Sequence, residues 1–300
     1  MASPPQDALR APAFIRRLFS HFPLITHPVD LPPMSIEDFQ LLSTNTTTRQ
    51  HTEKSINNNT LYSFTDSTDS SIASFNPTCL KWQTYLKIRN IPFKTQSSNN
   101  HASPSGSLPF LVISSQSDRI SQTISSPKLG KWIEEHAVGS VNTVDTDGGD
   151  YRAFLSLVEG AIRDAWLYAL YIDPTNLSTL TIPKYTAQVS LWPVPQILGS
   201  QMRQAAIDAI RKSSTSTSPT GTELYSKAIE AFRALSTLLS SDTWFFGASE
   251  AGMFDAEVFA YTHLLLSLEI GGSGRVVVEG LIGFENLVEH EERIRQRWFS

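Results

Sequence analysis

The chain has 300 residues, of which 40% are apolar and 18% are charged, and its net charge is -5. No long run of Lys or Arg is present, which argues against a nucleic-acid-binding surface. The single cysteine excludes an intramolecular disulfide and a thiolate metal site, and we expect no metal. No stretch approaches about 18 uninterrupted apolar residues, so we predict no membrane-spanning helix.

The first apolar segment of the chain lies near its beginning. Phe14, Leu18 and Phe22 recur at helical spacing, with Pro12 at a first helical position and Pro23 after the last one. Such an Arg-containing amphipathic segment is typical of a mitochondrial presequence, but a short helix that docks on a partner or on the rest of the chain is the preferred interpretation. Its apolar side chains are Phe14, Ile15, Leu18, Phe19, Phe22, Leu24 and Ile25.

Residues 43–59 are almost entirely polar and predict a loop or linker. We therefore interpret residues 1–59 as an arm on a linker, long enough to reach a second subunit. The alternative is that the arm packs back onto its own chain.

A small mixed segment follows the linker. "TLYSF" predicts a short strand, and Asn76 followed by Pro77 predicts the start of a helix that ends at Asn90. Further short strands are expected at 92–94 and 107–113, and "SSPKLGKWIEEHA" predicts a helix.

From Asp150 onward the pattern becomes nearly continuous helix. Apolar residues recur at helical spacing from Tyr151 to the stop at Asp173 and Pro174, and two more amphipathic segments follow. "FDAEVFAYTHLLLSLEI" is apolar around most of its circumference and predicts a central buried helix. "GFENLVEHEERIRQRWF" predicts a closing amphipathic helix.

This order of elements resembles the glutathione-transferase fold. The thioredoxin-like domain of that fold has a cis-proline in a stretch similar to "SGSLPFLV", which implies that Pro109 is cis. "FFGASEAGMFDAEVFAYTHLL" is similar to its helix-capping motif, with Asp255 as the structural acidic residue. We therefore predict an α/β plus all-α protein, with a thioredoxin-like domain at 60–145 and a helical domain at 150–300.

Within that superfamily, "NPTCLKWQTYLKIRNIPF", "SNNHASPSGSLPFL" and "FPLITHPVDLP" are similar to the metaxins, in particular to fungal metaxin-like receptor subunits of the mitochondrial sorting and assembly machinery. The resemblance implies a non-enzymatic protein without a cofactor, peripheral on the cytosolic face of the mitochondrial outer membrane. It implies three kinds of partner: the β-barrel core subunit, a second metaxin-like subunit, and β-barrel precursors whose β-signal it helps recognise.

Cys79 is a candidate nucleophile because a helix N-terminus favours a thiolate. In glutaredoxin-like relatives the first position of CPxC is the nucleophile, and Asn76 occupies that position here. Cys79 also shares a stripe with Trp82 and Leu86 at i+3 and i+7, which indicates a structural, packed role for all three. We favour packing over reactivity.

The resemblance to transferases weakens at two further places. Their γ-glutamyl site has an acidic-Ser pair, whereas "TISSPKLGKW" keeps only the serines, and no base is positioned by sequence beside a Tyr or Ser nucleophile. A glutathione-dependent transferase or thiol enzyme stays the alternative function, and a general interaction scaffold is a third.

A peptide-binding hypothesis follows from Pro109. If it is cis, the amide and carbonyl of Leu108 are expected to be presented to an extended precursor strand, which would pair there by β-augmentation. The competing expectation is that this edge is covered by the loop at 66–75 or by the N-terminal segment.

Overall fold

The computed structural model describes residues 58–114, 121–137, 148–187, 191–213 and 219–300. By its contacts the chain divides into compact units at 1–55 and 56–300, and everything described here belongs to the second unit. Both predicted folded domains, 60–145 and 150–300, therefore lie inside one compact unit. The predicted arm, including all seven of its apolar residues, lies outside the described residues.

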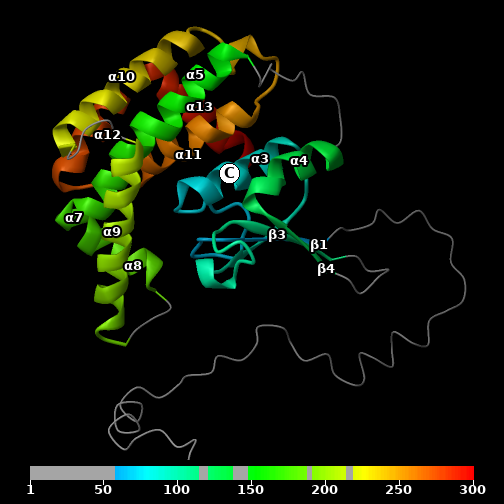
Figure 1. Ribbon diagram of the computed structural model, residues 1–300. Helices are drawn as coiled ribbons and strands as arrows, with labels where there is room; N and C mark the ends of the chain where they lie inside the picture. Colours follow the sequence, from blue (N-terminus) through cyan, green and yellow to red (C-terminus); the bar gives the residue numbers. More distant parts are fainter. Residues whose placement is uncertain (1–57, 115–120, 138–147, 188–190, 214–218) are drawn as a thin grey trace, which may run out of the picture. The chain divides into compact units, whose positions relative to one another are not determined.

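A four-stranded mixed sheet forms the first part of this unit (Figure 1). Its order is β2-β1-β3-β4; β1 and β2 are parallel, whereas β1 with β3 and β3 with β4 are antiparallel. The helices α3 and α4 lie on one face of the sheet. The elements are β1 (Asn58–Ser63), α3 (Pro77–Ile88), β2 (Lys94–Ser97), the 3-10 turn η2 (Asn100–Ala102), β3 (Phe110–Ser114), β4 (Ser121–Ser125) and α4 (Ser126–His136).

The ends of α3 agree with the sequence prediction. The side chain of Asn76 accepts a hydrogen bond from the Cys79 amide (3.2 Å), and Pro77 occupies the first helical position. Asn90 follows the helix with a positive φ of 54°, a conformation that Asn tolerates better than most residues.

Two predicted strands and the end of the predicted linker differ in the structure. The strand expected at 92–94 runs at Lys94–Ser97, since it begins where Lys94 pairs with Thr60. The predicted linker at 43–59 overlaps β1 at its end, because Asn59 is part of β1 and its buried side chain donates to the Pro92 carbonyl (3.0 Å). The strand expected at 107–113 begins only at Phe110, after the cis Leu108-Pro109 bond.

The helical part begins with a broken helix. Its α-helical segments α5 (Gly149–Leu157) and α6 (Arg163–Leu167) alternate with the π-helical turns η3 (Val158–Ile162) and η4 (Tyr168–Ile172). The remaining elements are α7 (Pro174–Asn176), η5 (Leu177–Thr181), α8 (Ile182–Tyr185), α9 (Val194–Ser213), α10 (Gly221–Leu239), η6 (Phe245–Gly247), α11 (Met253–Ser267), η7 (Gly272–Gly274), α12 (Arg275–Ile282) and α13 (Glu285–Trp298).

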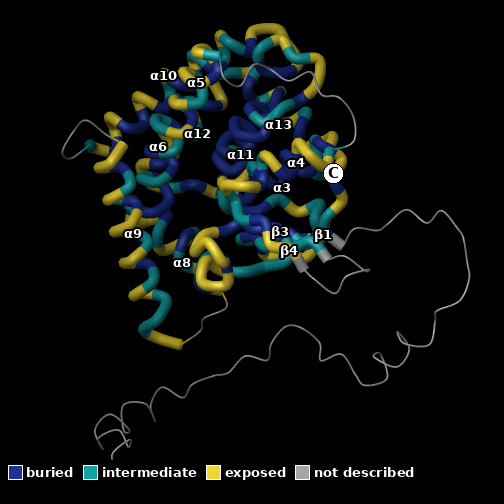
Figure 2. The backbone as a smooth tube through the Cα atoms, turned by 45° about the vertical axis from the view of Figure 1, so that its right-hand side comes forward, coloured by how far each residue is buried: buried dark blue, intermediate teal, exposed yellow. Residues whose placement is uncertain are grey.

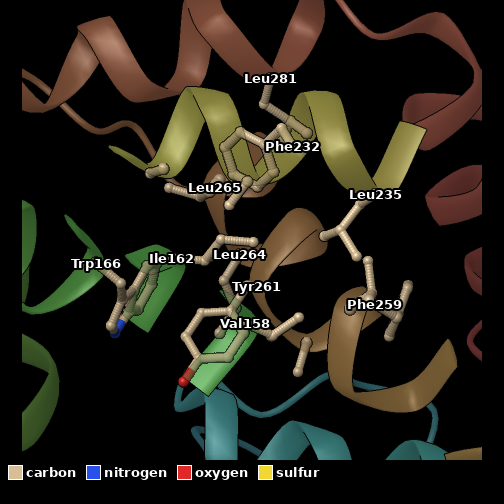
Figure 3. Close-up of a cluster of buried hydrophobic side chains, with 14 of the residues drawn as sticks. Val158, Ile162, Trp166, Phe232, Leu235, Phe259, Tyr261, Leu264, Leu265 and Leu281 are labelled. Atoms are coloured by element: carbon tan, nitrogen blue, oxygen red, sulfur yellow. The ribbon is translucent and has the colours of Figure 1, made fainter. Parts of the chain in front are cut away.

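The helix α11 lies at the centre of the helical part, as its sequence predicts. Every residue from Phe254 to Leu265 is buried, which Figure 2 shows as a continuous dark segment. Phe232 of α10 and Leu281 of α12 converge with Leu264 of α11 in one large apolar cluster (Figure 3). Such close-packed apolar burial is the main stabilising contribution to a fold of this kind. Among the described residues, no helix is both long enough and apolar enough to cross a membrane.

Candidate functional site

The thiol of Cys79 lies in the first turn of α3, beneath the start of β3. It is completely buried and packs against Leu108 and Phe110. Burial raises the pKa of Cys79, and its hydrogen bonds to Phe64 and Ser74 lower it by a smaller amount. The resulting pKa is about 12. The thiol therefore stays protonated at neutral pH, and the attraction of a helix N-terminus for a thiolate does not prevail here.

The three residues of the predicted stripe, Cys79, Trp82 and Leu86, pack in two separate clusters. All three side chains are buried, but Trp82 and Leu86 belong to the cluster between the sheet and its helices, whereas Cys79 belongs to a separate cluster near the cis-proline. Two turns of helix separate Cys79 from Leu86 by about 10.5 Å along the axis. Residues on one helix face at that distance meet different parts of the sheet.

Pro109 has the cis bond that the sequence resemblance implies. However, the Leu108 amide is not free: it donates to the Asn100 side-chain oxygen (3.0 Å), and Leu108 is buried. The expectation of an exposed pairing amide at Leu108 is therefore wrong. Among the described residues, the side chain that takes up this amide comes from the turn around η2 and not from the loop at 66–75. The N-terminal segment lies outside the described residues.

Asn76, which stands where the sequence resemblance implies a nucleophile, begins a chain of neutral hydrogen bonds. Asn76 Nδ2 donates to the Tyr185 hydroxyl (3.0 Å), and the Tyr171 hydroxyl donates to the same oxygen (2.8 Å). Burial raises the pKa of Tyr185 to about 12 and that of Tyr171 well above its usual range. Neither phenol therefore ionises near neutral pH, and neither is a general base.

A cleft of about 620 Å³ opens beside this hydrogen-bond chain. One wall is the cleft-facing side of α9, with Leu198, Met202 and Ala205 among its residues. The opposite wall is the turn around η2. Carboxamide side chains are unusually frequent in the lining: Asn76, Asn99, Asn100 and Gln201. A second cavity of about 330 Å³ adjoins the cleft and shares Phe64, Asn99 and Tyr185 with it.

The orientation of two of these carboxamides is fixed from inside the fold. Asn99 Oδ1 accepts from the amides of His101 (3.0 Å) and Ala102 (3.3 Å), and Asn100 Oδ1 accepts from the Leu108 amide. The Nδ2 ends of Asn99 and Asn100 thus supply donors rather than acceptors to a ligand. An apolar wall opposite such donors suits a ligand with carbonyl oxygens on one side and apolar groups on the other.

Asp255 lies in the first turn of α11 and is buried. It accepts from the amides of Gly252 (2.8 Å) and Phe245 (3.1 Å), and His290 Nε2 lies 2.9 Å from the same carboxylate. A full capping box has a second hydrogen bond, from the side chain of the N-cap residue, which Gly252 cannot form. His290 of α13 contacts the Asp255 carboxylate in addition. Asp255 fixes the fold and does not line the cleft.

Few of the cleft-lining residues could be predicted from the sequence. Gln201, Met202 and the alanines of α9 look like an ordinary amphipathic helix, because the cleft they face is formed by a turn a hundred residues earlier. Asn100 lies in the quoted motif "SNNHASPSGSLPFL" but no pattern indicated its role, and Tyr185 lies in no quoted motif. Their roles depend on contacts over 8 and 109 residues of sequence.

Two family models match the chain. Residues 77–176 match the glutathione S-transferase N-terminal domain, and residues 228–294 match the glutathione S-transferase C-terminal domain. A glutathione S-transferase of Ceriporiopsis subvermispora, solved in complex with glutathione, is similar with a TM-score of 0.51 and 16% identity, over 80% of this chain and 97% of that one. At this identity the likeness shows the fold alone.

Relatives with curated names cover most of the described fold. Metaxin-1 of Macaca fascicularis is 30% identical over 227 residues, which are 72% of this chain and 68% of that protein. Metaxin-1 of Homo sapiens is also 30% identical, and the match spans 46% of its length. A protein of Arabidopsis thaliana named mitochondrial outer membrane import complex protein METAXIN is 22% identical over 75% of this chain and 68% of its own.

Proposed function

This chain belongs to the metaxin family, and we propose that it is a non-enzymatic, peripheral subunit of the sorting and assembly machinery of the mitochondrial outer membrane. In this role it helps recognise the β-signal of β-barrel precursors and insert them into the membrane. The relative from Arabidopsis thaliana is named as a mitochondrial outer membrane import complex protein, which supports a place in outer-membrane import. The match spans 46% of the human relative, so β-signal recognition and membrane insertion are proposed for this chain and not carried over from that protein.

The observation that supports a non-enzymatic role is the hydrogen-bond chain of Asn76, Tyr185 and Tyr171. It begins where the sequence resemblance implies a nucleophile, and all its members are neutral. The nearby thiol of Cys79 is buried and protonated. The cleft is also lined by His101 and Arg163, but the three members of this chain and the Cys79 thiol all stay protonated and offer it no nucleophile, which suits binding better than turnover.

We place the precursor segment in the cleft along α9, and not on the Leu108 amide. Asn99 and Asn100 supply donors for the carbonyl groups of an extended segment, and Leu198 and Met202 supply apolar contacts for its side chains. Leu108 and Pro109 then act indirectly, because the Leu108 amide holds the Asn100 side chain in place.

The partner subunits are proposed as the β-barrel core subunit and a second metaxin-like subunit, on the cytosolic face of the membrane. The arm with Phe14, Ile15, Leu18, Phe19, Phe22, Leu24 and Ile25 is the proposed grip on one of them. Gentle extraction of the tagged chain from mitochondria should recover a barrel subunit and a second metaxin-like chain in near-equal amounts.

Site-specific photocrosslinking tests the cleft. A photoreactive residue at Gln201, which lines the cleft, should crosslink to an arriving β-barrel precursor. The matched control is Gln204, three residues further along the same helix, exposed, and hydrogen-bonded to Asp208 (3.0 Å) away from the cleft lining. Equal crosslinking at both positions would contradict the placement. Retention on immobilised glutathione together with turnover of a thiol-reactive substrate would contradict the non-enzymatic role.

A further inference from the structure

The N-terminal end of α9 concentrates exposed apolar surface. Leu191 is 50% exposed, Trp192 78% and Ile197 52%. The described part of the chain has three other large apolar residues with comparable exposure, Ile72, Val276 and Ile282, which lie elsewhere. We call Leu191, Trp192 and Ile197 the α9 tip. In Figures 1 and 2 this end of α9 extends beyond α8, at the lower margin of the coloured fold.

The sequence around the α9 tip has no charge. Positions 185–202 contain no Asp, Glu, Lys, Arg or His. A tryptophan with aliphatic neighbours and no nearby charge has the composition of segments that enter the boundary between lipid head groups and acyl chains. A protein partner usually offers or requires at least a rim of charged and polar contacts.

The backbone at this helix end is also suited to a medium poor in water. The first amides of a helix normally lack partners inside it, and burying them away from water is costly. Here Pro193 and Pro195 have no N–H, Val194 N donates to Leu191 O (2.9 Å), and Ile197 N donates to Pro193 O (3.2 Å). Most of the donors that would have to leave water are therefore missing or already bonded.

The size of the surface argues against a second copy of the chain as its occupant. Three side chains expose a few hundred Å² at most, whereas a stable protein interface buries about 1,200–2,000 Å² in total. A bilayer has no such minimum, since each apolar side chain contributes on its own.

We propose that the α9 tip inserts Leu191, Trp192 and Ile197 into the surface of a phospholipid bilayer. This inference rests on the membrane location in the proposed function, and it assigns the lipid-contacting residues to one helix end. Leu198 and Gln201, which line the cleft, directly follow the tip along α9, so insertion brings this end of the cleft close to the bilayer.

Flotation of the full-length chain with vesicles of phosphatidylcholine, phosphatidylethanolamine and cardiolipin tests this. The variant Leu191→Gln/Trp192→Gln/Ile197→Gln should partition at least about tenfold less onto vesicles. The matched control Ile72→Gln/Val276→Gln/Ile282→Gln changes equally exposed residues and should stay within about twofold of the unmodified chain. Both variants keep the N-terminal arm, so their difference reports on the α9 tip.

A direct probe uses vesicles with brominated acyl chains, which quench nearby tryptophans. Quenching should be clearly larger in the unmodified chain than in Trp192→Phe, which keeps the tip apolar and the flotation unchanged. Equal flotation of the tip variant, or equal quenching in both chains, would overturn the proposal.

The remaining outcomes separate this inference from the proposed function. If the unmodified chain does not float but still co-purifies with the import machinery, the inference fails and the function stands. If vesicle binding depends on the tip but no such machinery co-purifies, the inference stands and the function fails. Self-association or partner binding that the tip variant loses, without any change in flotation, would assign the tip to a protein contact instead and overturn the proposal.

Discussion

The body of α3 and its N-terminus contact the helical part in different ways. Along its body, α3 packs against α11: Leu80 joins the large helical cluster, Ala256 of α11 joins the sheet cluster, and Lys81 forms a buried ion pair with Glu257 (2.7 Å). At its N-terminus, Asn76 reaches Tyr185 across the edge of an open cleft.

This difference separates residues that hold the fold from residues that can bind a ligand. In the contact of α3 with α11, every polar group needs a matched partner because it is out of water. At the cleft, carboxamides and hydroxyls can exchange partners with water or a ligand at little cost. Substitutions at the two places should therefore differ in their effect on the free energy of unfolding.

The largest effect is expected from Asp255→Ala. It removes the acceptor of two backbone amides and leaves His290 buried without its carboxylate, so we expect a loss of about 3–5 kcal/mol in chemical denaturation. Asp150→Ala is the control, since Asp150 is also in a first helical turn but is exposed, and it should cost less than about 1 kcal/mol. Similar losses in both variants would contradict the role given to Asp255.

The second-largest effect is expected from Lys81→Met, which should lower the free energy of unfolding by about 2–4 kcal/mol at neutral pH. The reason is that Glu257 stays buried but loses the cation that it pairs with. Burial raises the pKa of Glu257 above the ordinary value of 4.5, and Lys81 opposes this. Because folding raises the pKa of Glu257, this carboxyl contributes to stability at pH values below its ordinary pKa. That contribution is lost as the pH rises through its pKa in the folded state. Without Lys81 this loss should deepen.

The measurement for Lys81→Met is therefore denaturation as a function of pH. The stability gap to the unmodified chain should widen as pH rises above about 4.5, and Lys81→Met/Glu257→Gln should narrow it again. A gap that stays constant over this range would mean that the ion pair is not what stabilises the contact.

The smallest effect is expected at the cleft. Tyr185→Phe removes the hydroxyl that joins Asn76 to Tyr171 but keeps the ring contacts, so the loss should be about 1 kcal/mol. Thermal unfolding measures it, with Tyr171→Phe as the partner variant. A loss of stability as large as that of Asp255→Ala would contradict the expected difference between the buried contact of α3 with α11 and the cleft.

Most of the fold was predictable from local pattern. The helix at α3 has a cap and a proline at its start, α11 is apolar on all sides, and "SLPFLV" is distinctive enough to predict the cis bond of Pro109. The strand β4 was missed because "SQTIS" has one apolar residue, Ile124, which is enough for an edge strand with a single buried position.

The candidate site was less predictable, since it depends on distant contacts. Nothing near Leu108 in sequence indicates that the Asn100 side chain accepts its amide hydrogen bond, or that Tyr185 bonds Asn76. Periodicity assigns faces to helices but does not say which face meets a cleft. The α9 tip left a readable signal, the uncharged run with "LWPVP", whose meaning depends on how exposed Trp192 is.

The central place of α11 also has a consequence for how the chain is made. The helix α3 is synthesised early, but its packing partner α11 follows more than 160 residues later, and α11 is itself covered by α13 at the end of the chain. Such long-range contacts form slowly, and the apolar surface of α3 stays uncovered during translation. The contacts of the sheet part with α11 can therefore form only after α11 has left the ribosome.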